Sequence, residues 1–250
     1  MSSPAGASPV PPGGQRIKLR VDEKLHLKDP ASTELGERII EDGILMLDEL
    51  GYEAFTFRKL AERIGTAEPS IYRYFRSKHR LLLYLTSWYW SWMEYRLLIA
   101  TANVVSAEER LRLALRELTQ PIRKDESTPR IDAAALYRVV VAESSKAYLR
   151  RDVDLENREG LFRSYKRLCR TVAGMITAIN PQYRYPVALV STVVESSHMQ
   201  KYFAEHLPSL TEVTYAGADG STTAFLTELV FSAIARDEGT TAIESRGRTG

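Results

Sequence analysis

Apolar residues recur at helical spacing along most of the chain, and an alternating strand pattern is almost absent. From Leu35 to Leu50, apolar or small residues follow one another every three or four positions, and Gly51 then ends the pattern. Shorter segments of the same kind follow, most of them opened by Ser, Thr or Asp and closed by glycine or proline. The pattern predicts an all-α protein of about nine helices.

Local signals predict where these helices begin and end. The first is expected to start at Asp29-Pro30 or at Ser32. Thr56, Thr66 and Ser77 are the expected N-caps of the next three, and Gly65 is expected to close the second. The fourth should run to about Ala102. A capping box at 106–109 is expected to open the next helix. Four later helices are expected to cover residues 128–149, 154–180, 184–206 and 221–236.

Composition restricts the class of protein. The longest apolar stretches, such as residues 81–85, are far shorter than the roughly 18 residues that cross a bilayer, and no signal peptide pattern opens the chain. The single cysteine, Cys169, cannot form an internal disulfide and suits a reducing compartment. We therefore expect a cytoplasmic protein with no membrane partner.

The net charge of +2 hides an uneven distribution. Residues 55–80 hold seven Lys and Arg against two acids, whereas residues 34–53 hold seven acids against Arg38 alone. A compact basic patch is the electrostatic footprint of nucleic-acid binding. A solvated helical face would give the same count.

The basic segment, residues 55–82, reads FTFRKLAERIGTAEPSIYRYFRSKHRLL. Two short amphipathic segments joined at Gly65 form the pattern of a helix-turn-helix, whose second helix enters the DNA major groove. Apolar residues of both segments are spaced to pack together: Leu60, Ala61, Ile64, Ile71 and Phe75. The polar side of the second segment is then left partly outside.

The same span closely resembles the helix-turn-helix of the TetR family of transcriptional regulators. The family pattern F-T-x-R-x-L-A-x-x-x-G, six residues, and Y-x-Y-F-x-S-K-x-x-L is met without a gap over residues 55–81. The match covers about 30 residues, or about 50 with the preceding helix. The resemblance implies a dimeric DNA-binding regulator, by family expectation a repressor, with a helical body behind the head.

The resemblance also assigns roles to single positions. Thr56 and Arg58 look like phosphate contacts, and Arg58 is also a candidate base contact. Four residues occupy base-reading positions: Glu68, Pro69, Ser70 and Arg73. Tyr72 and Tyr74 look like contacts to the DNA backbone, and Lys78 looks like a phosphate clamp. Alternatives stay open, because Tyr74 could be partly core, Glu68 could complement the helix dipole, and Arg58 could pair with an acid.

These assignments divide the chain into four parts. Residues 1–28 are expected to be a flexible arm, whose basic stretch 16–20 could enter the minor groove or be a solvated or packed tail. Residues 29–78 form the predicted DNA-binding domain and 79–237 the predicted effector-binding and dimerisation domain. Residues 238–250 are expected to be a disordered tail.

The helix expected from Lys78 to about Ala102 is apolar on both faces, so it should be buried. The resemblance implies that this helix transmits ligand binding to the head. Aromatic residues on it and elsewhere in the body could line an effector pocket or fill the core: Trp88, Trp92, Tyr95, Tyr137, Phe162 and Tyr165. Nothing in the sequence selects the chemistry of a small-molecule effector.

Small residues recur on the last two predicted helices: Ala188, Ser191, Thr192, Ser196, Ala224 and Ala233. Such a face lets helices approach closely across a twofold axis, and the resemblance implies a homodimer here. A two-headed dimer fits palindromic operator DNA.

An enzyme is the main competing class. The four histidines show no metal-ligand spacing, and phosphate-binding, nucleophile-elbow and dinucleotide motifs are missing from the sequence. We expect no catalytic residue, metal or cofactor. A second alternative is a DNA-binding regulator controlled by a protein partner, which would differ in having no effector pocket.

Overall fold

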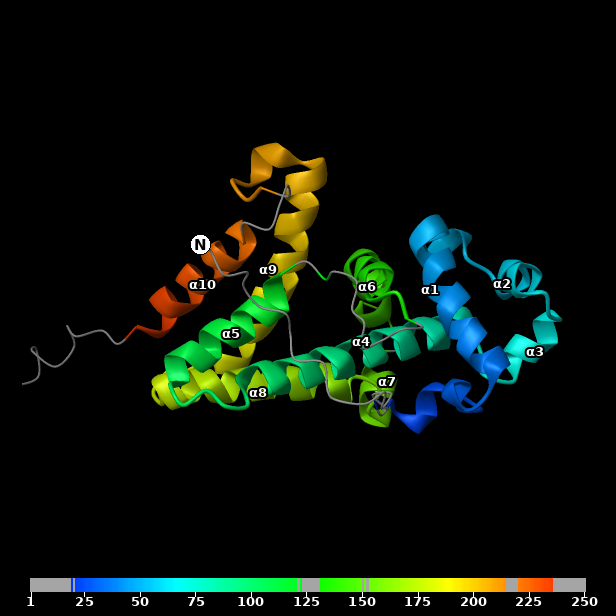
Figure 1. Cartoon of the computed structure of the whole chain (residues 1–250), viewed down its shortest axis with the longest axis horizontal. Helices are drawn as coiled ribbons and strands as arrows, with labels where there is room; N and C mark the ends of the chain where they lie inside the picture. The colour runs from blue at the N-terminus through cyan, green and yellow to red at the C-terminus, as the bar shows by residue number, and fades with distance from the viewer. Residues whose placement is uncertain are drawn as a thin grey trace, which may run out of the picture. The chain divides into compact units, whose positions relative to one another are not determined.

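The computed structural model describes residues 19, 21–120, 122, 131–149, 151, 153–214 and 220–235, and this part is all-helical, as the periodicity predicted. Its α-helices are α1 Glu34–Ala54, α2 Phe57–Ile64, α3 Glu68–Tyr72, α4 Lys78–Thr101, α5 Ala107–Thr119, α6 Ala133–Tyr148, α7 Val153–Glu159, α8 Arg163–Ile179, α9 Pro186–His206 and α10 Ser221–Ile234 (Figure 1). Three short 3₁₀ helices accompany them: η1 Glu23–Leu25, η2 Pro30–Ser32 and η3 Pro208–Leu210.

The chain separates into two compact units. The first takes Met1–Trp92 and Pro121–Ser164, and the second takes Met93–Gln120 and Tyr165–Gly250. In the first, α1 packs on α2, on α6 and on η2, while α2 packs on α3. In the second, α10 packs on α5 and α9 (Figure 1). The predicted boundaries of the DNA-binding domain and the body remain predictions.

Several predicted helix ends are confirmed by local hydrogen bonds. Thr56 accepts from the backbone N–H of Lys59, and Ser77 accepts from that of Arg80, so both are N-caps. Gly65 ends α2 with φ 64° and ψ 46°, a left-handed conformation that only glycine adopts at little cost. The helical geometry of α1 breaks at Gly51, where the sequence pattern stops.

Other predicted ends were wrong. Thr66 does not cap α3, whose N-cap residue is Ala67, with no side-chain cap. The single helix expected over residues 154–180 is two helices, because Gly160 has φ 88° and the helical path cannot continue through it. α6 begins at Ala133, where the Asp132 carboxylate accepts from two backbone N–H groups. The start expected at residues 128–129 lies outside the described residues.

The end of the segment expected to be flexible is ordered. Leu25 is 1% exposed, and the Leu27 N–H donates to the carbonyl of Tyr74. α1 begins at Glu34, after the N-cap Thr33, whose hydroxyl accepts from the Gly36 N–H. Most of the basic stretch 16–20 and the whole tail 238–250 lie outside the described residues.

The expectation for α4 is confirmed, since it is buried from Leu81 to Met93 apart from Trp88. The hydroxyls of Thr86 and Ser91 are buried there too, and each donates to the carbonyl four residues earlier, which satisfies them within the helix. Within the described ranges no helix is long and apolar enough to cross a membrane. The same ranges hold no cluster of three potential metal-ligating His, Cys, Asp or Glu residues.

Candidate nucleic-acid interface

The helix-turn-helix is built from a shared apolar side. Leu60 and Ile64 of α2 are at most 2% exposed, and so are Ile71 of α3 and Phe75 after it. The turn between the helices is closed by Gly65, whose N–H donates to the carbonyl of Glu62, and by Thr66, whose N–H donates to that of Ala61. Because this side is buried, the opposite side of α3 is presented outward.

Most of the predicted DNA-contacting side chains lie on that outward side. Pro69, Tyr72 and Arg73 are exposed, while Glu68 and Ser70 are half-buried. The Tyr72 ring stands edge-on to Phe57 with 5.1 Å between centroids, and its hydroxyl lies 3.5 Å from Glu68 Oε1. Tyr72 is therefore held by α2 while 47% of it stays accessible.

Tyr74 takes the core alternative. It is 3% exposed, and its hydroxyl lies 2.7 Å from the Thr33 hydroxyl, the N-cap of α1. Lys28 places its ammonium 5.3 Å from the centre of the Tyr74 ring. In this structure Tyr74 links α3 to the start of α1.

Part of the basic patch is neutralised by the acidic first helix. Arg63 reaches Asp42 at 3.1 Å and Glu49 at 2.6 Å, and its hydrogen bond holds the pKa of the Glu49 carboxyl below its usual value. Arg58 pairs with Glu62 at 3.1 Å, the ion-pair alternative for that residue, with 80% of its side chain exposed. An exposed pair of this kind is weak and can open to a phosphate.

Lys78 lies at the junction of three helices. Its ammonium donates to the carbonyls of Tyr52 at 2.8 Å, Glu53 at 3.2 Å and Phe55 at 3.2 Å. It also stands 4.4 Å from the centre of the Tyr52 ring. These are the carbonyls that the end of α1 leaves unpaired, so Lys78 caps α1 from the first residue of α4.

A carboxylate that sequence reasoning missed acts on the same junction. Glu143 of α6 is 5% exposed and accepts from the Tyr52 N–H at 2.9 Å, just after the break at Gly51. Lys146 approaches Glu143 at 2.8 Å and Glu53 at 3.4 Å, and Arg138 binds Asp48 at 2.6 Å. The signal available was a lone acid on the core side of an apolar helix.

The predicted effector-binding residues divide between the two units. Trp88 and Trp92 stack with 6.2 Å between ring centroids, and Trp92 is 0% exposed. Tyr137 lies 6.3 Å from Tyr89, and Phe162 meets Tyr148 edge-on at 5.5 Å; both are half-buried.

In the second unit, Tyr95 and Tyr165 are half-buried, and the Tyr165 hydroxyl donates to Glu195 at 3.3 Å. The first unit thus brings the two tryptophans together, and both pocket lining and core filling remain open for the set.

The DNA-binding head, which contains the helix-turn-helix, is the part of the chain that matches known proteins. Residues 39–85 fit the family model described as bacterial regulatory proteins, tetR family. The class A tetracycline repressor protein from transposon 1721 of Escherichia coli is 43% identical over 44 residues, covering 18% of this chain and 20% of that protein. The Escherichia coli class C repressor protein is 39% identical over 46 residues, covering 18% and 21%. The chain thus spans about a fifth of these relatives.

Among solved structures, the crystal structure of apo AibR covers 77% of this chain and 96% of its own, with 13% identity and a TM-score of 0.43. The matched segment 39–85 runs from the second turn of α1 into α4 and contains the whole helix-turn-helix described above. The capped α2, the left-handed Gly65 and the outward side of α3 are thus found in the matched segment. Residues 39–85 of this chain are thus similar to the DNA-binding head of bacterial regulatory proteins of the tetR family.

Proposed function

We propose that the chain is a dimeric transcriptional repressor that binds palindromic operator DNA through α2 and α3. The observation that carries this is the outward side of α3, where Pro69, Tyr72 and Arg73 are exposed over a fully buried apolar side. A short helix with one face buried and the other exposed, followed directly by Arg73, is the geometry that reads a major groove.

The proposed contacts fall into two groups. Glu68, Pro69, Ser70 and Arg73 read bases. Thr56, Arg58 and Tyr72 hold backbone phosphates, since they lie at the start of α2 and on the exposed edge of α3. Tyr74 and Lys78 hold the head together, because their polar atoms are bonded within the protein.

Arg73 gives the sharpest test. After selection of bound duplexes from a random pool, Arg73→Ala should relax preference at particular base pairs, at a cost of about 1–3 kcal/mol each. Binding is measured by fluorescence anisotropy on the selected duplex and on single-base variants. The control is Arg170→Ala, an exposed arginine of α8. A pool with no enriched sequence, or an Arg73→Ala protein with unchanged preference, would contradict the proposal.

We place the dimer interface on α9 and α10. These helices pack on one another and still expose large apolar side chains: Val187 at 48%, Met199 at 48%, Tyr202 at 49%, Phe225 at 45% and Leu229 at 40%. The small residues Ala188, Thr192 and Ala224 are exposed on the same two helices. A second copy covers such a face by symmetry.

Light scattering tests the interface. The parent chain should have the mass of a dimer, and Leu229→Glu should have that of a monomer, because a buried carboxylate at the interface finds no partner. Leu98→Glu is the matched control, since Leu98 of α4 is 53% exposed and lies outside the proposed interface. A dimeric Leu229→Glu protein would place the contact elsewhere.

We further propose that a small molecule bound by the body controls release of the operator. The supporting observation is the set of half-buried aromatic side chains at Trp88, Tyr137 and Phe162. The relatives' names describe tetracycline repressors, but their match is confined to the head and gives no reason to propose tetracycline here. A thermal-shift screen with the full chain tests for an effector. Control by a protein partner is the alternative if no small molecule stabilises the chain.

A further inference from the structure

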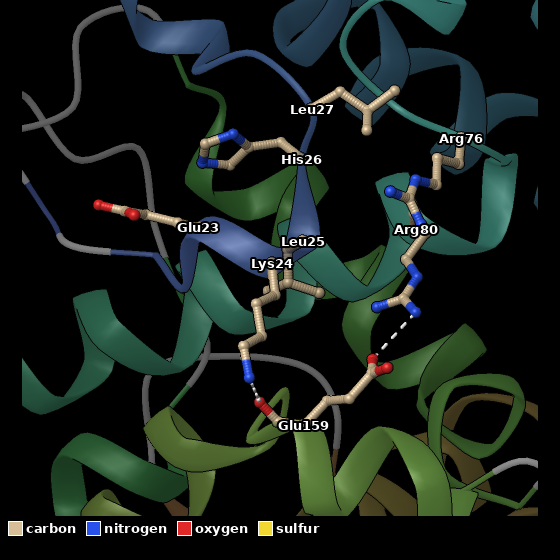
Figure 2. Close-up of a pocket in the computed structure, with 8 residues that line it drawn as sticks. All are labelled: Glu23, Lys24, Leu25, His26, Leu27, Arg76, Arg80 and Glu159. Carbon is tan, nitrogen blue, oxygen red and sulfur yellow. Dashed lines mark hydrogen bonds and ion pairs between the residues drawn. The ribbon is translucent and has the colours of Figure 1, made fainter.

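A pocket of about 320 Å³ lies at the base of the head, between residues 23–27 and the start of α4 (Figure 2). Its lining is Glu23, Lys24, Leu25, His26, Leu27, Arg76, Arg80 and Glu159. Figure 2 shows Arg76 and Arg80 on one side of the pocket, with Glu23 and His26 on the other. The volume is at the lower end of the range of small-molecule sites.

The wall formed by residues 23–27 is fixed by contacts at each end. Leu25 is buried, and the Leu27 N–H donates to the Tyr74 carbonyl at 2.7 Å. The His26 ring meets Tyr84 edge-on at 5.9 Å, and the Lys24 ammonium donates to the Glu159 carbonyl at 3.3 Å. The pocket is therefore preformed, which lowers the entropic cost of binding.

Arg80 has donor capacity left over. Its Nη2 donates to Glu159 Oε2 at 3.1 Å, while its Nη1 is buried and meets no acceptor in the described part of the chain. Buried guanidinium N–H groups are normally paired, so Nη1 is a donor that lacks an acceptor on a residue that lines the pocket. Arg76, four residues earlier, is exposed and adds a second guanidinium.

The charges define the complementary ligand. Lys24, Arg76 and Arg80 oppose the carboxylates of Glu23 and Glu159, which leaves one positive charge in excess. Leu25 and Leu27 add apolar surface to the same lining. We propose that this pocket binds a small organic monocarboxylate, with the carboxylate between Arg80 Nη1 and Arg76 and its apolar part against the leucines.

Such a ligand joins the N-terminal segment to the link between α3 and α4. Arg76 lies in that link and Arg80 in the first turn of α4, so occupancy couples the pocket to the recognition helix. Ligand binding in this pocket depends on its own lining residues, and so it is independent of operator binding, of the aromatic candidates in the body and of the proposed dimer.

Benzoate is the probe, with neutral benzamide as its matched control, titrated by calorimetry into the full chain at constant ionic strength. Benzoate should bind saturably and benzamide should not. Arg76→Gln and Arg80→Gln should each weaken benzoate binding by about tenfold or more, because each removes a charged hydrogen bond. Arg170→Gln, on exposed α8, should bind benzoate as the parent does.

A second Arg80 variant and a titration with inorganic phosphate complete the experiment. If Arg80→Gln does not fold, Arg80→Lys takes its place. Arg80→Lys keeps a positive charge beside Glu159 and removes Nη1, so it should also lose benzoate binding. Inorganic phosphate separates one anion class from another. Benzoate that fails to saturate, or that is weakened equally by Arg170→Gln, overturns the proposal. So does phosphate binding through the two arginines without benzoate.

Discussion

Replacing Trp92 by alanine should lower the free energy of unfolding by about 3–5 kcal/mol, the cost of removing a large buried aromatic side chain. Trp92 is 0% exposed, stacks on Trp88 and lies 6.2 Å from the Tyr89 ring, so the alanine leaves a cavity among aromatic neighbours. Unfolding in urea, followed by circular dichroism at constant protein concentration, measures the loss.

The same measurement separates the two interpretations of the aromatic set. A residue that lines an open pocket has contacts on one side only, so its truncation costs much less than that of a close-packed one. Trp88→Ala is the matched control, because Trp88 is half-buried one turn away on α4. A loss below about 1 kcal/mol for Trp92→Ala would mean that Trp92 faces a cavity and is available to an effector.

Trp92→Phe is the variant for the effector response itself. It keeps an aromatic ring in the core while changing the shape and removing the indole N–H, so folding should be retained. If α4 transmits effector binding to the head, this variant should keep operator affinity and change the response to an effector found by screening.

Local signals explain why much of the fold could be predicted from the sequence. Caps such as Thr56 and Ser77 act through hydrogen bonds to residues three positions away, and Gly65 acts through its own φ. Each is therefore visible within a few letters. The burial of α4 is visible for a similar reason, because apolar residues on both faces leave no side for water.

Tertiary contacts explain what the sequence did not show. The phosphate contact predicted for Lys78 from its place after the recognition helix stays a prediction, and its ammonium also donates to carbonyls 23 to 26 positions earlier. Glu143 accepts a hydrogen bond from a backbone N–H that lies 91 positions earlier in the sequence, and the Tyr74 hydroxyl bonds that of Thr33, 41 positions earlier. No short sequence pattern predicts contacts between residues so far apart in the chain. The break at Gly160 was missed because an isolated glycine can be tolerated inside a helical pattern as well as end one.

Acid should destabilise the chain through His198. This histidine of α9 is 5% exposed, and burial, with the nearby Lys201 ammonium, lowers its pKa to about 3. The unfolded chain takes up the proton near pH 6.5 and the folded chain does not, so stability is lost as pH falls from about 6.5 toward 3. At pH 5 the loss from this group is about 2 kcal/mol.

The experiment is the free energy of unfolding at pH 7 and at pH 5, at one protein concentration so that any dimer contributes equally. His198→Gln cannot titrate but keeps a hydrogen-bond donor, so it should remove about 2 kcal/mol of the pH dependence. His206→Gln is the matched control, since the His206 side chain is 51% exposed on the same helix. Burial lowers the pKa of Lys201 from 10.5 to about 8. The titration of Lys201 therefore changes stability only in the range between about pH 8 and 10.5, which lies outside the acid range. If the pH dependence of the unfolding free energy is the same in His198→Gln as in the parent, the His198 imidazole is hydrated in solution. The packing around this part of α9 would then be looser than in this structure.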